Sequence, residues 1–216
     1  MRSILFGSGL ALAMLFFFCG RRAERSLPAI LAIGGFSQSA FQIILIFSFQ
    51  VLYGYLFYKL GFLFAFFMLG LFISGWFYAG RVGPLPEARR MLLKVQAAVA
   101  IFSAILPALL YGLARTNYAF IVKSGQSALF PALSLFVGLT GGYVFALSNQ
   151  IYLSVYSNPG RARVAGLTYG WDLIGGCLGA VICAVILIPV AGVTVTCALL
   201  AALNLSAYLL LSKTSA

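Results

Sequence analysis

Long apolar runs follow one another along almost the whole chain, and this pattern restricts the fold more than any other feature. A transmembrane helix needs about 20 consecutive, mostly apolar residues. Seven runs meet or approach this length, and short polar segments separate them. They cover 3–19, 28–53, 61–80, 91–113, 128–153, 164–188 and 193–211. The pattern predicts an all-α, polytopic membrane bundle of about seven transmembrane helices.

The scarcity of charge argues against a soluble fold. Only 8% of the 216 residues are charged and 63% are hydrophobic, whereas soluble domains have about 25% charged and about 45–50% apolar residues. Seven helices use nearly all of this length, which leaves no room for a soluble catalytic domain. We therefore expect a protein that is not an enzyme.

The first run resembles the apolar part of a signal peptide, but Arg21 and Arg22 follow it and no small-x-small cleavage site precedes them. We therefore expect a retained helix. The predicted organisation is an N-terminal transmembrane helix with a basic cytoplasmic loop in 1–27, followed by a six-helix membrane bundle in 28–216. Pro28 suits the first position of the second helix, where its missing N–H would have no partner.

Basic residues divide unequally between the two sides that alternating spans define. One side has four of the fourteen Lys and Arg: Arg2, Lys59, Arg115 and Lys123. The other side has the remaining ten: Arg21, Arg22, Arg25, Arg81, Arg89, Arg90, Lys94, Arg161, Arg163 and Lys213. Cytoplasmic loops carry the excess of Lys and Arg, so we expect a bacterial cytoplasmic membrane protein with its N-terminus outside and its C-terminus in the cytoplasm.

The net charge of +11 is explained by these loops, and no basic stripe along a polar helix face indicates nucleic-acid binding. The chain has no His, so His-ligated haem is excluded. Its four Cys lie in apolar runs without a C-x-x-C pair, a pattern typical of small buried residues. We expect no cofactor of its own, although a bound lipid or a quinone between helices stays open.

Asp172 is the one acid that lies clearly inside an apolar run. A charge in the membrane is expensive, so this side chain should face the bundle interior and have a partner. It is either a proton or cation site or a structural carboxyl that is hydrogen-bonded to neighbouring polar groups or held neutral. With no other acid in a run and no His, the structural role is favoured.

Three glutamines mark the second run as a further polar candidate. Gln38 and Gln42 are four residues apart and share a helix face, and Gln50 lies nearer the end of the run. Such a face either lines a cavity or bonds to neighbouring helices. Bonding to neighbouring helices is the commoner case.

Glycines recur at helix-packing intervals in the fifth and sixth runs. Small residues four apart let helix backbones approach closely. The predicted packing pairs are Gly138 with Gly142, Gly166 with Gly170, and Gly175 with Gly179.

The sixth run reads Tyr169-Gly-Trp-Asp172-Leu-Ile-Gly175-Gly-Cys-Leu-Gly179, with Pro189 and Gly192 after it. It resembles the Y-x-x-D-x-x-G-x-x-x-G helix in the membrane part of bacterial spermidine synthase-like proteins, the fused major-facilitator/spermidine-synthase type. Segments 49–75 and 138–145 are similar to that family's first hairpin and its glycine-rich fifth span. The resemblance covers about 28–211 and implies six helices that form half of a major-facilitator bundle, with Tyr169 and Asp172 as motif residues.

The chain departs from that family where catalysis would occur. It has no room for the soluble aminopropyltransferase domain, the basic loop 80–90 lacks the usual Asp, and Gln42 stands where the family's first helix has an acid. We expect a non-catalytic subunit that scaffolds or anchors partner proteins in a larger membrane complex, with electron-transfer complexes among the candidates. The alternative is a half-size major-facilitator-like carrier of a polyamine or another cation that acts as a dimer.

Overall fold

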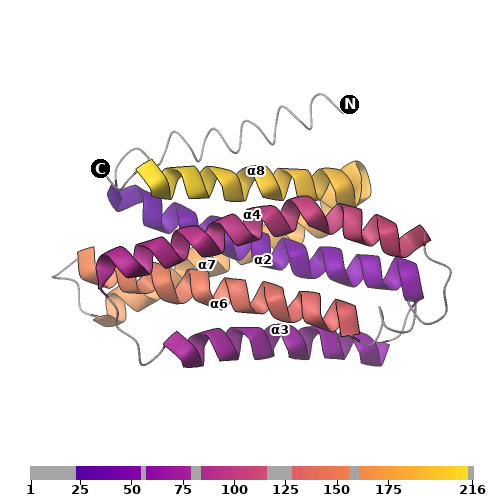
Figure 1. The fold of residues 1–216 in the computed structure, drawn as a ribbon, viewed down its shortest axis with the longest axis horizontal. Coiled ribbons are helices and arrows are strands. Elements are labelled where there is room, and N and C mark those ends of the chain that lie inside the picture. The colour runs from indigo at the N-terminus through magenta and orange to yellow at the C-terminus, as the bar shows by residue number, and fades with distance from the viewer. Residues whose placement is uncertain (1–22, 55–56, 79–83, 116–127, 156–160, 214–216) are drawn as a thin grey trace.

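The computed structural model of the protein describes residues 23–54, 57–78, 84–115, 128–155 and 161–213. These residues form α-helices and π-helical turns, at 128–129 and 183–191, and no strand occurs among them (Figure 1). The helices are α2 (Ala23–Tyr53), α3 (Phe57–Tyr78), α4 (Leu85–Arg115), α6 (Phe130–Val155), α7 (Arg161–Ile182), the π-helix η2 (Cys183–Ala191) and α8 (Gly192–Lys213).

Five continuous helical stretches in this part of the chain are long and apolar enough to span a membrane. They are Leu27–Tyr53, Phe57–Tyr78, Leu85–Arg115, Phe130–Ser154 and Arg163–Ser212. The last stretch has 50 residues and combines α7, η2 and α8. The all-helical architecture expected from the apolar runs is therefore present among these residues, with several helices suited to a multi-pass membrane protein. The first run, 3–19, lies outside the described residues, so seven spans stay a prediction.

Two helix starts differ from the sequence prediction. Segment 81–90 was expected to be a loop, but α4 begins at Leu85. Pro86 fits this first turn because its missing N–H would have no partner there, and the Glu87 and Ala88 amides bond the Pro84 carbonyl at 3.0 and 3.2 Å. Pro28 is not the first residue of its helix, since α2 begins at Ala23.

The sixth and seventh runs are joined without a loop. The sixth run was expected to end at residue 188, but η2 continues through Pro189 to Ala191. The reversal occurs at Gly192, whose φ of 79° favours a residue without a Cβ. The Gly192 amide bonds the carbonyls of Ile188 and Leu187, so the end of η2 stays hydrogen-bonded as the chain turns.

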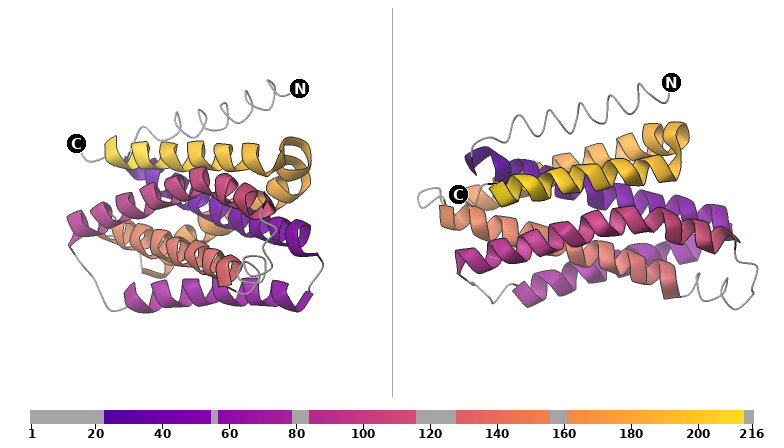
Figure 2. Two further views of the ribbon diagram at one scale, coloured as in Figure 1. Left: turned by 45° about the vertical axis from the view of Figure 1, so that its right-hand side comes forward. Right: turned by 45° about the horizontal axis from the view of Figure 1, so that its top comes forward.

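The helices alternate in direction along the long axis of the bundle (Figure 1). Helices α2, α4 and α7 run one way, and α3, α6 and α8 run the other (Figures 1 and 2). The closest pairs are α3 with α6, α2 with α7 and α4 with α8. Helix α2 also contacts α6 and α8, so it is the central helix.

This alternation gathers the described basic residues mostly at one end of the bundle. Arg89, Arg90 and Lys94 lie in the first turns of α4, and Arg163 lies in the first turn of α7, at the same end. Lys59 and Arg115 lie at the opposite end. The separation agrees with the charge asymmetry that predicts the orientation in the membrane.

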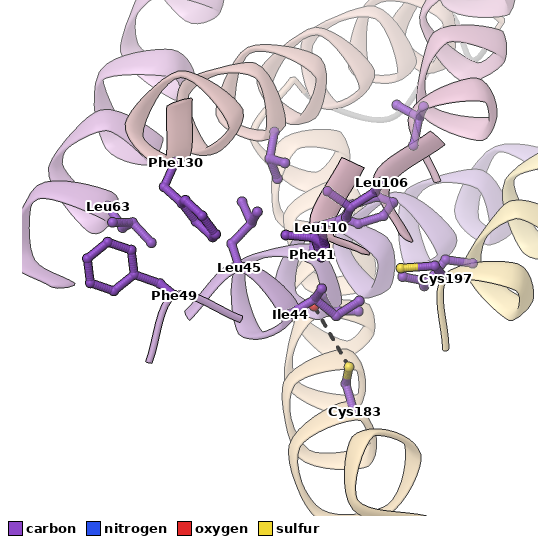
Figure 3. Packing of buried hydrophobic residues seen from close by; sticks show 14 residues of the cluster. Phe41, Ile44, Leu45, Phe49, Leu63, Leu106, Leu110, Phe130, Cys183 and Cys197 are labelled. Atoms are coloured by element: carbon purple, nitrogen blue, oxygen red, sulfur yellow. Dashed lines mark hydrogen bonds between the residues drawn. The ribbon is translucent and has the colours of Figure 1, made fainter. Parts of the chain in front are cut away.

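The larger hydrophobic core surrounds the second half of α2. Phe41, Ile44, Leu45 and Phe49 are almost fully buried there, and Figure 3 shows them beside side chains of α3, α4, α6, η2 and α8. The rings of Phe49 and Phe130 of α6 meet edge to face with their centroids 5.4 Å apart. The Tyr53 ring lies 5.3 Å from the Phe49 ring. This core fixes α2 and thereby positions the polar residues of its first half.

Candidate functional site

Three polar side chains join α2, α4 and α8 inside the bundle. Gln96 Nε2 donates to Asn204 Oδ1 at 2.8 Å and lies 3.3 Å from the Asn204 backbone oxygen. Asn204 Nδ2 in turn donates to Ser37 Oγ and to the Leu200 carbonyl, both at 2.8 Å. All three side chains are at most 1% exposed. In an apolar setting these bonds fix the rotation of each helix relative to the other two.

A small cavity lies beside this network, between α2, α4, α6 and α8. Its volume is about 10 Å³. Its polar lining residues are Ser37, Gln38, Gln96, Thr140 and Asn204. Gln38 reaches this place because Gly141 lies beneath it: a Cβ at Gly141 would overlap the Gln38 side chain.

A second polar contact joins α2, α3 and α6. Ser134 Oγ lies 2.7 Å from the Leu63 carbonyl and 3.0 Å from Gln42 Oε1, while Gln42 Nε2 has no partner in the described part of the chain. One hydroxyl proton serves only one of the two oxygens. With the Gln42 amide turned over, Nε2 donates to Ser134 and Ser134 donates to the Leu63 carbonyl, so that every short contact joins a donor to an acceptor. Gln42 is thus a bond between helices rather than a lining residue of the cavity.

Asp172 lies where α7 packs closely on α2. A Cβ at Gly35 would overlap the Asp172 backbone oxygen and would lie 2.9 Å from Oδ1. The side chain is half-buried, about 16 Å along α7 from Arg161 at about 1.5 Å per residue. Among the described residues no hydrogen bond or ion pair reaches its carboxyl group. The partner that the sequence argument expected is therefore not found in this part of the chain.

The same side of the bundle carries other polar groups, of which Thr168 is buried, Ser39 and Asn149 are half-buried and Tyr169 is exposed. Thr168 of α7 bonds Asn149 of α6 at 3.2 Å, and the Tyr169 ring meets Phe145 edge to face at 6.3 Å. Ser39 of α2 lies near Gly176, where a Cβ would be 3.1 Å from its Oγ. We call this surface the Asp172 face and define it by Ser39, Asn149, Tyr169 and Asp172.

The predicted packing glycines fall into two groups. A Cβ at Gly138 or Gly142 would overlap Phe67 or Ser74 of α3, and one at Gly175 or Gly179 would overlap the α2 backbone at Ala32 or Phe36. Gly166 and Gly170 differ, because nothing among the described residues lies within 4 Å of such a Cβ. These two glycines make no close helix contact here, since they lie on the outer side of α7.

The remaining predicted polar residue, Gln50, is half-buried near the end of α2, where its backbone carbonyl accepts the Gly54 amide at 2.9 Å. It is not near the cavity lining. Gln96, Ser134 and Asn204 are site residues that the sequence reading did not single out. The available signal was position: Gln96 continues the apolar stripe of α4 between Leu92 and Val99.

Comparisons with family models, with curated proteins and with solved structures find no match to this chain. The resemblance to spermidine synthase-like membrane proteins therefore stays a prediction.

Proposed function

We propose that this chain is a non-catalytic integral membrane subunit that holds another membrane protein in a larger complex, and that the Asp172 face is its contact surface. The observation that carries the proposal is the half-buried Asp172 carboxyl group without a described partner. An Asp at the centre of a membrane helix costs about 2.5–3.5 kcal/mol on insertion scales when it faces lipid. A protein partner that covers this face and bonds to the carboxyl group removes that cost.

The surroundings of Asp172 support a protein contact rather than a small-molecule site. Tyr169 and Leu173 are exposed beside it on the same side of α7, and the cavity between α2, α4, α6 and α8 does not include it. A second helix placed along this side of α7 would cover these two side chains and the carboxyl group together. Interhelical bonds of polar side chains are a common means of association in membranes.

The test is the size of the complex in a mild-detergent extract, measured by fluorescence-detected size exclusion at native expression. The unmodified chain should elute well above monomer size, and Asp172→Leu should move it to the monomer position. Thr194→Val removes an exposed hydroxyl from α8 instead and should leave the complex intact. A monodisperse monomer for the unmodified chain would contradict the proposal.

The alternative, a half-size carrier that works as a dimer, is favoured by one observation. The three closest helix pairs are symmetric between the triplet α2, α3, α4 and the triplet α6, α7, α8. If each helix of the first triplet is matched in order to one of the second, the pair of α2 with α7 corresponds to the pair of α6 with α3, and the pair of α4 with α8 corresponds to itself. Each helix of the first triplet runs opposite to its counterpart in the second. Two such triplets form an inverted repeat, which is frequent in secondary transporters. Against it stands the shortage of acids that could replace water around a polyamine.

Proteoliposome uptake separates the two functions. The carrier predicts saturable uptake of labelled spermidine by the purified chain, lost in Asp172→Asn, together with a dimer mass by light scattering. The subunit predicts no uptake above empty liposomes, and a complex that contains a second protein.

A further inference from the structure

The cavity between α2, α4, α6 and α8 contains a buried acceptor with no donor. Gln96 lines the cavity and is 1% exposed, yet its Oε1 has no hydrogen-bond partner among the described residues. An unsatisfied buried polar atom costs about 1–3 kcal/mol. Such an atom beside an empty space is a specific reason to expect a ligand there.

The neighbouring groups determine which atom of the Gln96 amide lacks a partner. The Leu200 backbone carbonyl can only accept, so the Asn204 atom 2.8 Å from it must be the Nδ2 donor. Asn204 Oδ1 therefore faces Gln96, and the Gln96 atom 2.8 Å away must be the Nε2 donor. Turning either amide over would place two acceptors together. Gln96 Oε1 is thus fixed as the atom without a partner.

We propose that this cavity binds one water molecule that donates a hydrogen bond to Gln96 Oε1. A volume of about 10 Å³ is about what one water needs, and a buried water requires two to four polar partners. Thr140 supplies a second acceptor, because its own proton is directed to the Phe136 and Val137 carbonyls, each at 3.0 Å. The water would link the network of α2, α4 and α8 to α6.

Other occupants fit this chemistry less well. A metal cation such as Mg²⁺ or Ca²⁺ takes six or more oxygen ligands, whereas the network leaves one amide oxygen unengaged and no carboxylate lines the cavity. An organic ligand exceeds the volume. The site is also separate from the Asp172 face, so it stands or falls independently of the proposed subunit function.

Water-edited solid-state NMR of the labelled full chain in lipid tests the site. Magnetisation from water should reach the Gln96 and Thr140 side chains and persist when surface water is filtered out. Gln96→Leu should abolish the transfer at Thr140, and Thr140→Val should weaken it at Gln96 while that residue keeps its Asn204 contact. Ser206→Ala, whose hydroxyl bonds only the Leu203 carbonyl of its own helix, should change neither signal. No buried-water transfer in the unmodified chain would overturn the proposal.

A melting experiment distinguishes water from a monovalent cation. The Tm of the full chain should be the same in sodium chloride and in choline chloride of equal ionic strength. A saturable rise of Tm with sodium that disappears in Gln96→Leu would show that the cavity binds a cation instead of water and would refute the assignment.

Discussion

The amide side chains of Gln42, Gln96 and Asn204 have defined orientations because backbone carbonyls in their networks can only accept. The Leu200 carbonyl orients Asn204, which orients Gln96, and the Leu63 carbonyl similarly orients Ser134 and then Gln42. Neither sequence of bonds includes an ionised group, so both avoid the cost of a charge in the membrane. The residues with the most specific contacts are therefore neutral ones.

Removing the central amide of the first network should destabilise the bundle. Asn204→Ala leaves Gln96 and Ser37 without their shared partner, and we expect a loss of about 1–2 kcal/mol in the free energy of unfolding. Denaturation by sodium dodecyl sulfate, followed by circular dichroism in mixed micelles, measures this value. Ser206→Ala is the matched control on the same helix. Equal stability of the two variants would show that the Gln96–Asn204 bond contributes nothing.

Single helices show which parts of the fold were predictable. Apolar length alone predicted the helices because lipid demands that each backbone bond be satisfied within its own helix. Their ends were less predictable, since Pro84 and Pro86 favour a turn and a helix start equally. The partners of Gln42 and Gln96 depend on how distant helices rotate against each other, and local sequence does not contain that information. For the same reason, the local sequence does not show that Gly138 contacts another helix and Gly170 does not.

Two glycine substitutions test helix contact at the element scale. Gly138→Ala would place a methyl group against the Phe67 carbonyl of α3, and we expect a loss of about 1–3 kcal/mol from forced separation of α3 and α6. Gly170→Ala meets open space and should gain about 0.5–1 kcal/mol from helix propensity. Detergent melting curves compare the two. A stable Gly138→Ala would mean that the two helices are not in close contact.

The end of α8 depends on a side chain of α4. Arg89 donates from an Nη atom to the Leu211 carbonyl at 2.6 Å, where a helix C-terminus favours a cation. Arg89→Met should lower stability by about 0.5–1 kcal/mol, measured by thermal melting. Arg90→Met removes the same charge from the exposed neighbouring position and should have a smaller effect. Similar losses in both variants would assign the effect to general charge rather than to this bond.

On the scale of the whole molecule, the alternating directions of the described helices place their ends in two groups. The end with the starts of α4 and α7 carries most of the described basic residues. A membrane with this bundle across it would therefore have one strongly basic side, as the positive-inside rule requires of a cytoplasmic face.

Reporter fusions test that orientation. Alkaline phosphatase fused after Arg115 should be active because this end is expected outside the cytoplasm, and green fluorescent protein fused after Lys213 should fluoresce. Moving the two reporters to the opposite sites should abolish both signals. Activity of the phosphatase after Lys213 would reverse the predicted orientation.

The pairing of α4 with α8 also sets an order of events during synthesis. Gln96 and Asn204 are 108 positions apart, so α4 leaves the ribosome and enters the membrane long before its partner exists. Until α8 is inserted, the Gln96 amide faces lipid, the translocation machinery or a chaperone. A ribosome stalled before residue 200 would thus hold a nascent chain with an unpaired amide in the membrane, and membrane quality-control proteases would have their longest access to the protein at that stage.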